Sequence, residues 1–307
     1  MPKKGRSKIN MDKKNSGILC AILAAAFYAL SAPFSKILLN YIPETLTAGF
    51  LYLGAGICML LIAPLRKNKK EAKEEKHLTR KELPYTVAMI LLDIAAPICL
   101  LVGLGSTTAA SASLLNNFEI VATAVIALSV FRERISPRLW GGILFITLSC
   151  AVLSADNVSE LHFSGGSLFI LLAAVLWGFE NNCTRKISSK DPLEIVLLKG
   201  IFSGLGSLII GLVCDERITV LWSVFAALGI GAVSYGMSIY LYIYAQRHLG
   251  AARTSAYYAV SPFIGTLLSL IVFRELPDWR YWTGLALMIA GAFLASSDKP
   301  LFRKAKP

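Results

Sequence analysis

The sequence has few charged residues for its length. Only 16% of its 307 residues are Asp, Glu, Lys or Arg, whereas soluble globular domains carry about 25%. Hydrophobic residues make up 55% of the chain, and the mean hydropathy is +0.61. These proportions exclude a soluble globular protein and indicate an integral membrane protein.

The side-chain patterns of several membrane enzymes are also missing. Haem and quinone sites usually use histidine at membrane depth, but His77, His162 and His248 all lie in polar connections. The sequence has no Gly-Asp pair, His-Glu-x-x-His motif or Ser/His pair of an intramembrane protease. The six cysteines lie in or beside apolar runs without short pair spacing, which indicates packing residues. We therefore expect no catalytic residues, no metal and no cofactor.

Positive charge is unevenly distributed. The net charge is +12, and most of the 31 Lys and Arg residues fall in the N-terminal arm, in alternate connections and at the C-terminus. On the other side, the connection 156–164 holds acids and no Lys or Arg. This is the positive-inside pattern of a membrane protein and does not indicate nucleic-acid binding. It predicts a multi-pass protein of the cell (plasma) membrane with both termini in the cytoplasm.

Apolar segments near the length of about 20 residues that crosses a bilayer fill most of the chain. We place ten of them, at 17–39, 45–65, 84–104, 107–131, 137–155, 165–187, 193–213, 219–245, 249–273 and 278–296. The basic arm 1–16 and tail 297–307 are expected to be cytoplasmic, and the arm to be disordered. The connection 66–83 is charged throughout, so we expect a solvated loop.

The chain contains an internal repeat. Residues 111–133 recur at 253–275 with the same length, a small-residue entry and a Phe-Arg-Glu exit. Because five helices per unit is an odd number, a second copy enters the membrane from the opposite side. We therefore predict an all-α integral membrane fold of ten transmembrane helices in two inverted five-helix repeats, 17–155 and 165–296. An ordinary bundle with accidental similarity is the alternative.

The repeated motifs resemble the ten-helix, EamA-type members of the drug/metabolite transporter superfamily. The matching pieces are Trp177-Gly178 to Arg185, Phe27-Tyr28 to Lys36, Ser261-Pro262-Phe263, and the closing acids Glu133 and Glu275. Two positions depart from the pattern: Ile120 replaces the proline of the second copy, and Phe50 stands where a basic residue is common. The resemblance implies transport of small polar metabolites such as amino acids, through a central cavity open alternately to each side.

The expected function is secondary transport of a small polar metabolite by alternating access. The expected partners are a small-molecule substrate and the lipid bilayer, in a monomer or homodimer, without nucleic acid. A membrane channel or a non-transporting receptor remains the alternative. A carrier saturates and shows counterflow, whereas a channel does not.

Polar side chains at membrane depth are the candidates for the substrate site. Asp93, Glu119 and Glu180 would each cost about 2.5 to 3.5 kcal/mol facing lipid, so they should face the bundle interior. Pro262 should leave the Tyr258 carbonyl without its helix donor. The candidate substrate-binding residues are Asp93, Asn116, Glu119, Trp177, Glu180, Asn181, Ser234, Tyr235, Tyr258 and Ser261. The alternative is that the small polar residues only join helices by hydrogen bonds.

Lys199 and Lys36 lie inside predicted helices, and each has an expected role. Lys199 is at the depth of Glu180, which predicts a structural or gating ion pair. Asp93 and Glu119 would then lack a full-charge partner, and one of them should bind a proton, which predicts proton-coupled antiport. The alternative is that both acids are structural. Lys36 is expected to be an interface anchor in preference to an anion site.

A pair of adjacent amides is expected to have two roles. Asn116 shares a helix face with Glu119. Asn117 points elsewhere, is spaced to pair with Ser113, and is expected to join helices.

Overall fold

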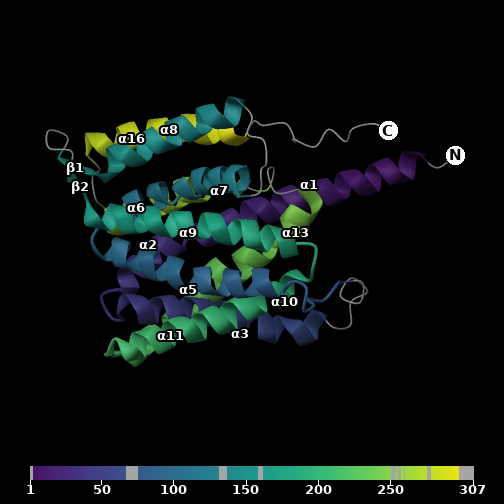
Figure 1. Ribbon diagram of the computed structural model, residues 1–307, viewed down its shortest axis with the longest axis horizontal. Helices are drawn as coiled ribbons and strands as arrows, with labels where there is room; N and C mark the ends of the chain where they lie inside the picture. The colour runs from purple at the N-terminus through teal and green to yellow at the C-terminus, as the bar shows by residue number, and fades with distance from the viewer. Residues whose placement is uncertain are drawn as a thin grey trace.

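A computed structural model describes the protein at residues 3–66, 75–130, 137–157, 162–249, 254, 257–258, 260–274 and 278–296. The molecule is a bundle of helices that run side by side between two ends, with the N-terminal part of α1 extending beyond one end (Figure 1). The first half contains α1 (Lys3–Ala29), α2 (Ser31–Leu38), α3 (Glu44–Arg66), α5 (Leu83–Gly105), α6 (Ala109–Leu115), α7 (Phe118–Ser129) and α8 (Pro137–Ser154).

Two short strands, β1 (Ala155–Asn157) and β2 (His162–Phe163), pair antiparallel between the halves. The second half contains α9 (Gly165–Ile187), α10 (Pro192–Leu198), the π-helix η1 (Lys199–Ser203), α11 (Gly204–Val213), α12 (Leu221–Gly231), the π-helix η2 (Ala232–Met237), α13 (Ser238–Leu249), α15 (Ser261–Phe273) and α16 (Trp279–Ser296).

Within the part of the chain that the structure describes, seven helical stretches are long and apolar enough to cross a membrane. They are Asn15–Leu38, Glu44–Arg66, Leu83–Gly105, Ala109–Ser129, Gly165–Ile187, Pro192–Val213 and Leu221–His248, and Trp140–Leu153 and Phe263–Phe273 are shorter apolar helices. The predicted helical membrane fold is therefore confirmed. The count of ten spans and the inversion of the repeats stay predictions. Glu133 and Glu275 lie outside the described residues.

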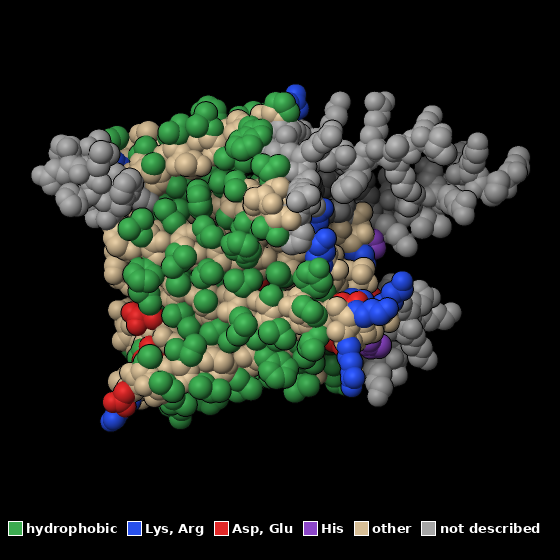
Figure 2. Space-filling model, in the orientation of Figure 1, with side chains coloured by type: hydrophobic (Ala, Val, Ile, Leu, Met, Phe, Trp, Pro, Cys, Tyr) green, Lys and Arg blue, Asp and Glu red, His purple; other side chains and the backbone are tan. Residues whose placement is uncertain are grey.

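The surface of the bundle is apolar over the length of the helices. Figure 2 shows hydrophobic side chains covering this face, with Lys and Arg side chains gathered mostly toward one end. Large side chains such as Leu61, Leu212 and Phe293 are more than 60% exposed. The interior holds serine, threonine and charged side chains within an apolar core. An apolar surface with the charged groups kept inside is the arrangement that a lipid solvent favours.

Helix α3 packs between the helices of the second half, where glycines bring the backbones close together. A Cβ added to Gly54 would lie 2.1 Å from the Leu228 carbonyl oxygen, and one added to Gly200 would lie 2.3 Å from the Gly56 nitrogen. Any larger side chain there would separate α3 from α12 or η1. This close approach holds the interior polar groups of α3, α5, α9 and η1 together.

The N-terminal arm differs from the prediction. It was expected to be disordered from Met1 to Ser16, whereas α1 is helical from Lys3. The physical reason is cooperative helix formation: residues that extend an existing helix need no new nucleus.

Candidate functional site

Three charged side chains meet inside the bundle. The Lys199 Nζ lies 2.8 Å from Glu180 Oε1 and 3.1 Å from Asp93 Oδ2. Lys199 begins η1, Glu180 is on α9 and Asp93 is on α5. All three are less than 5% exposed. We call Asp93, Glu180 and Lys199 the charge triad.

Two neutral hydroxyl groups also bind the carboxylates of the charge triad. Tyr52 on α3 donates a 2.8 Å hydrogen bond to Asp93 Oδ1. Thr184, one turn after Glu180 on α9, donates to the Glu180 carboxylate. Each carboxylate therefore has the ammonium and one hydroxyl as partners. Such extra hydrogen bonds are what make a buried ion pair tolerable.

The triad contains the predicted pair of Lys199 with Glu180 and corrects the expectation for Asp93. The sequence prediction left Asp93 without a full-charge partner, but its carboxylate shares the Lys199 ammonium. The ammonium reaches both acids because η1 places Lys199 between α5 and α9. A single cation can neutralise only one of the two carboxylates, so the triad has a formal charge of −1 when all three groups are ionised.

Glu119 lies apart from the triad in a different setting. The Asn181 amide donates to Glu119 Oε1, and the same nitrogen lies 3.4 Å from Thr123 Oγ1. Glu119, Asn181 and Thr123 are all partly accessible. Asn116 accepts the Glu119 backbone N–H at its carbonyl, at 3.1 Å, and donates from its side-chain amide to the Tyr28 hydroxyl. Glu119 is therefore an acid held by a neutral amide.

Tyrosine rings connect the triad with the region near Glu119. The Tyr52 ring contacts Tyr235 with centroids 5.0 Å apart, Tyr235 contacts Tyr28 at 5.9 Å, and Tyr28 contacts Tyr258 at 5.8 Å. Ser31 donates a 3.5 Å hydrogen bond to the Tyr235 hydroxyl. A continuous aromatic path with hydroxyl groups therefore runs through the interior.

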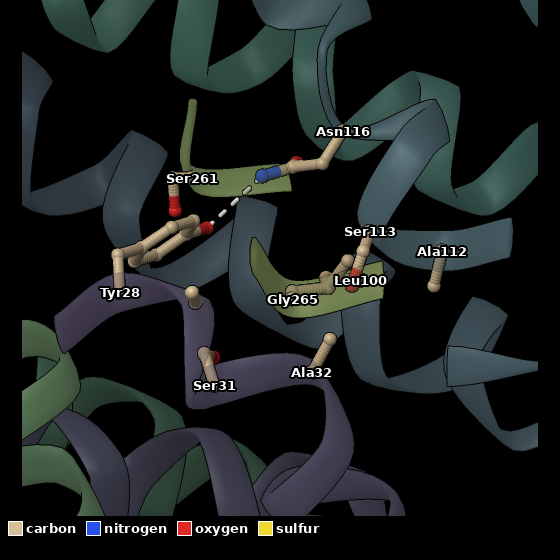
Figure 3. A pocket seen from close by; sticks show the side chains of 10 residues that line it. Tyr28, Ser31, Ala32, Leu100, Ala112, Ser113, Asn116, Ser261 and Gly265 are labelled. Atoms are coloured by element: carbon tan, nitrogen blue, oxygen red, sulfur yellow. Dashed lines mark hydrogen bonds between the residues drawn. The ribbon is translucent and has the colours of Figure 1, made fainter. Parts of the chain in front are cut away.

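A small cavity opens beside Tyr28. Its volume is about 20 Å³, and it is lined by Tyr28, Ala29, Ser31, Ala32, Leu100, Ala112, Ser113, Asn116, Ser261 and Gly265. Figure 3 shows Asn116 donating to the Tyr28 hydroxyl, at 3.2 Å, with Ser261 close by. We call it the polar cavity. It has room for about one water molecule.

The polar cavity lies where helices are interrupted. α1 ends at Ala29 and α2 begins at Ser31, because Pro33 has no N–H for the Ala29 carbonyl. Asn116 lies at the interruption between α6 and α7. Exposed backbone groups at interrupted helices commonly form binding sites in transport proteins.

The predicted effect of Pro262, a Tyr258 carbonyl without its helix donor, stays a prediction. α15 begins at Ser261, so Pro262 lies in the first turn. A proline there removes no bond from the helix interior. It lies where α15 starts, next to Ser261 of the polar cavity.

The predicted site residues fall into four places. Asp93 and Glu180 are in the charge triad; Glu119 and Asn181 are paired; Tyr235 and Tyr258 are in the tyrosine path; Asn116 and Ser261 line the polar cavity. Trp177 is buried in the apolar core, and Ser234 donates to the Ile230 carbonyl of its own helix. Two of the ten candidates, Asn116 and Ser261, thus line the polar cavity, and the substrate-binding role of all ten stays a prediction.

Several site residues were not among the candidates. Tyr28, Ser31, Ser113 and Gly265 line the polar cavity, and Tyr52 bonds to Asp93. Tyr28 and Ser31 flank the helix interruption, so Pro33 was the signal that could have identified them. The small residues carry no signal that separates a cavity lining from ordinary helix packing.

The structure also shows the surroundings of Lys36 and Asn117. Lys36 Nζ donates to the carbonyls of Leu104, Gly105 and Thr107 at 2.5, 3.2 and 2.7 Å, so it closes the C-terminal end of α5. Cations at that end are favoured by the helix dipole. The expected pair of Asn117 with Ser113 is not made, because neither Asn117 Nδ2 nor Ser113 Oγ has a hydrogen-bond partner among the described residues.

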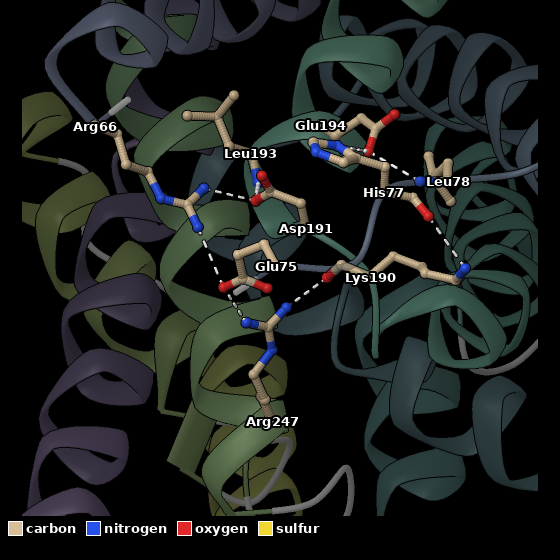
Figure 4. A network of polar contacts seen from close by, with 9 residues as sticks. All are labelled: Arg66, Glu75, His77, Leu78, Lys190, Asp191, Leu193, Glu194 and Arg247. Carbon is tan, nitrogen blue, oxygen red and sulfur yellow. Dashed lines mark hydrogen bonds and ion pairs between the residues drawn. The ribbon is translucent and has the colours of Figure 1, made fainter. Parts of the chain in front are cut away.

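A second polar network closes one end of the bundle (Figure 4). Arg66 binds Asp191 at 2.6 Å and Glu75 at 3.2 Å, and Arg247 also binds Glu75. Arg247 donates a second hydrogen bond to the Lys190 carbonyl. These contacts tie the end of α3 and the connection after it to the α9–α10 connection and α13. We call the group the end network.

More contacts extend the end network along the same connections. Lys190 pairs with Glu82 at 3.1 Å, and His77 lies 3.3 Å from Glu194. Hydrogen bonds from the Thr79 hydroxyl and backbone N–H, with help from Lys190, lower the pKa of Glu82 to about 2. Glu82 is therefore ionised at physiological pH, and its pairing with Lys190 persists.

Comparisons with known proteins identify the family. The chain is 27% identical over 299 residues to an uncharacterized transporter of Methanothermobacter thermautotrophicus, covering 91% of this chain and 85% of the relative. It is 24% identical to the uncharacterized inner membrane transporter YedA of Escherichia coli K12, over 86% and 85%. It is 20% identical to the uncharacterized transporter YyaM of Bacillus subtilis, over 85% and 87%.

A solved crystal structure has the same fold, with a TM-score of 0.66 at 18% identity, covering 92% of this chain and 96% of the other. The EamA-like transporter family matches the chain twice, at residues 15–155 and 164–297. The chain therefore belongs to the EamA-like transporter family.

Proposed function

We propose that the protein is a secondary transporter that moves a small polar metabolite across the cell membrane by alternating access. The polar cavity carries the proposal. It lies at the interrupted helices between the two halves and has a volume of about 20 Å³. A metabolite is larger than the one water that fits there. Binding must therefore move helices apart, which is the behaviour of a carrier and not of an open pore.

Helix packing supports two inverted five-helix repeats. α1 packs on α13 as α5 packs on α9, and α1 packs on α15 as α7 packs on α9. Exchanging the two halves maps each of these pairs onto the other. α8 with α16 and α6 with α15 map onto themselves. A pseudo-two-fold axis between the halves accounts for all these pairs, and substrate sites of inverted-repeat transporters lie beside such an axis.

The proposed orientation places the end network in the cytoplasm. Basic residues gather toward that end of the bundle, and α1 extends beyond it (Figures 1 and 2). The positive-inside rule then puts both termini and the connection after α3 in the cytoplasm. A tag inserted at residue 70 should be inaccessible in intact cells and become accessible after permeabilisation. Labelling in intact cells would contradict this orientation.

The end network is the proposed cytoplasmic gate. It joins connections from both halves through Arg66, Glu75, Asp191 and Arg247, so it must open when the halves separate on that side. Glu119 is the proposed proton-coupling acid, because it is partly accessible and pairs with an amide while the other two acids share Lys199.

A flux experiment tests the proposed function. Proteoliposomes containing the purified protein are loaded with a mixture of amino acids, amines and nucleosides, and exchange is followed by mass spectrometry. We expect saturable, counterflow-stimulated movement of at least one compound. Arg217→Gln, which removes an exposed ion pair with Asp215, serves as the active control. Absence of flux for the whole mixture would contradict the proposal, and flux without saturation or counterflow would indicate a channel.

A further inference from the structure

The polar cavity contains buried polar atoms with no hydrogen-bond partner among the residues that the structure describes. These atoms are Ser113 Oγ, Asn116 Oδ1 and Ser261 Oγ. The three residues are 6%, 8% and 1% exposed. An unpaired buried polar atom destabilises a protein by its full desolvation penalty. Three of them around one cavity indicate a place where a ligand supplies the missing hydrogen bonds.

The orientation of Asn116 defines what the cavity can bind. Its amide nitrogen donates to the Tyr28 hydroxyl at 3.2 Å, so its oxygen is left as an acceptor (Figure 3). The hydroxyls of Ser113 and Ser261 can donate or accept. The ligand group must therefore donate at least one hydrogen bond and can accept others.

The absence of charge on the described lining residues excludes some ligand groups. Among the described residues that line the polar cavity, none carries a charge. A carboxylate or phosphate would enter without a neutralising group and would have no proton to give Asn116. A hydroxyl or a carboxamide both donates and accepts and adds no charge.

We propose that the polar cavity binds a neutral hydroxyl or carboxamide group of the transported metabolite. This inference rests on the proposed transport function. Glu119 lies one turn after Asn116 of the cavity, whose backbone carbonyl accepts the Glu119 N–H at 3.1 Å. The substrate is therefore a small amine or amino acid that also carries a hydroxyl or carboxamide. Its ammonium lies toward Glu119 and its neutral group lies in the cavity.

Matched pairs of compounds test the proposal in proteoliposomes. The pairs are L-serine with L-alanine, L-threonine with L-2-aminobutyrate, L-asparagine with L-leucine, and ethanolamine with ethylamine. In at least one pair we expect kcat/KM to be at least about tenfold higher for the hydroxyl or amide member. Sites built to hydrogen-bond a substrate hydroxyl reject the analogue without it by this much or more.

Serine-to-alanine variants test whether the polar cavity causes the preference for the hydroxyl or amide member of a pair. Ser113→Ala and Ser261→Ala should reduce the preference to less than about threefold. Ser207→Ala on α11 is the matched control, because Ser207 Oγ is also buried without a partner but does not line the cavity. It should leave the preference unchanged. Removing an unpaired hydroxyl does not destabilise the ligand-free protein, so all three variants should keep or raise the melting temperature.

The outcomes separate this inference from the proposed function. Equal transport of both members of every pair, or an equal effect of Ser207→Ala, overturns the inference. Exchange of the metabolite mixture without transport of any member of the pairs also overturns it. If the mixture itself does not move, the proposed transport function fails instead.

Discussion

The interior holds two acid sites that are stabilised in different ways. Asp93 and Glu180 share the Lys199 ammonium and are almost fully buried, with exposures of 0% and 3%. Glu119 is partly accessible and receives its hydrogen bond from the Asn181 amide. The carboxylates of the charge triad are thus paired with a fixed cation, whereas the Glu119 carboxylate is paired with a neutral group.

This difference assigns different roles to the acids. Removing a buried charge from its partner is costly, so the charge triad is suited to holding α5, α9 and η1 together. An acid without a fixed cation can take up a proton or a ligand cation instead. Lys199 of the charge triad begins the π-helix η1. π-turns inside helices commonly occur at functional positions, so a structural role of the triad is compatible with motion of this helix.

The largest effect on stability is expected when the charge triad loses its cation. Lys199→Met leaves two buried carboxylates without a cation and should destabilise the protein by about 3 to 5 kcal/mol. Thermal unfolding in detergent, followed by size-exclusion chromatography, measures the loss. Adding Asp93→Asn and Glu180→Gln to the same variant should recover most of it, because the unpaired charges are then gone.

An exposed ion pair provides the control for that prediction. Arg217 and Asp215 are both more than 80% exposed at the side chain, and exposed pairs contribute about 0 to 1 kcal/mol. Arg217→Gln should therefore leave the melting temperature nearly unchanged. If Lys199→Met is as stable as Arg217→Gln, the triad does not hold the helices together.

A smaller effect is expected at the edge of the triad. Tyr52→Phe removes the 2.8 Å hydrogen bond to Asp93 and keeps the ring contact with Tyr235. Hydrogen bonds to charged groups contribute about 1.5 to 3 kcal/mol, so stability should fall by that amount. The same thermal assay measures it. A loss equal to that of Lys199→Met would mean that the hydroxyl, and not the ammonium, stabilises Asp93.

Sequence reasoning located the helices better than the contacts between them. Most segment boundaries agree with the helices to within a few residues, as for 165–187 and α9, because hydropathy and helix length reflect the bilayer directly. The exceptions are the starts of α1 and α15. The depth of Lys199 was also sufficient to predict its contact with Glu180. Depth alone did not show that Asp93 faces the same ammonium, because that depends on how α5 is rotated about its axis.

The polar cavity could not be predicted for a related reason. Ser113, Ser261 and Gly265 are small residues, which in a membrane sequence most often allow helices to pack. Their role depends on two helix interruptions and the start of α15 meeting at one point. Pro33 signals one of these interruptions, but nothing local in the sequence indicates that α6 is interrupted at Asn116.

The smallest effect on stability is expected for a substitution of Glu119. Its effect on transport tests the difference between the two acid sites. Glu119→Gln keeps the side-chain size and an oxygen that accepts from Asn181, so stability should change by less than about 1 kcal/mol. Function should change instead. A cationic substrate binds the ionised acid, so wild-type transport should rise with pH through the titration of Glu119, and the variant should show no such rise.

Substrate-driven proton movement in proteoliposomes distinguishes the two acid sites. The wild type should move protons against substrate, and Glu119→Gln should move substrate weakly and without protons. Asp93→Asn should lower stability but keep the pH profile, because its site is not the one that exchanges a proton. Thr123→Val, which alters only the 3.4 Å contact with Asn181, is the local control and should behave like wild type. Since each acid contacts different partners, an unchanged proton flux in Glu119→Gln, or a lost one in Asp93→Asn alone, would assign coupling to the charge triad instead.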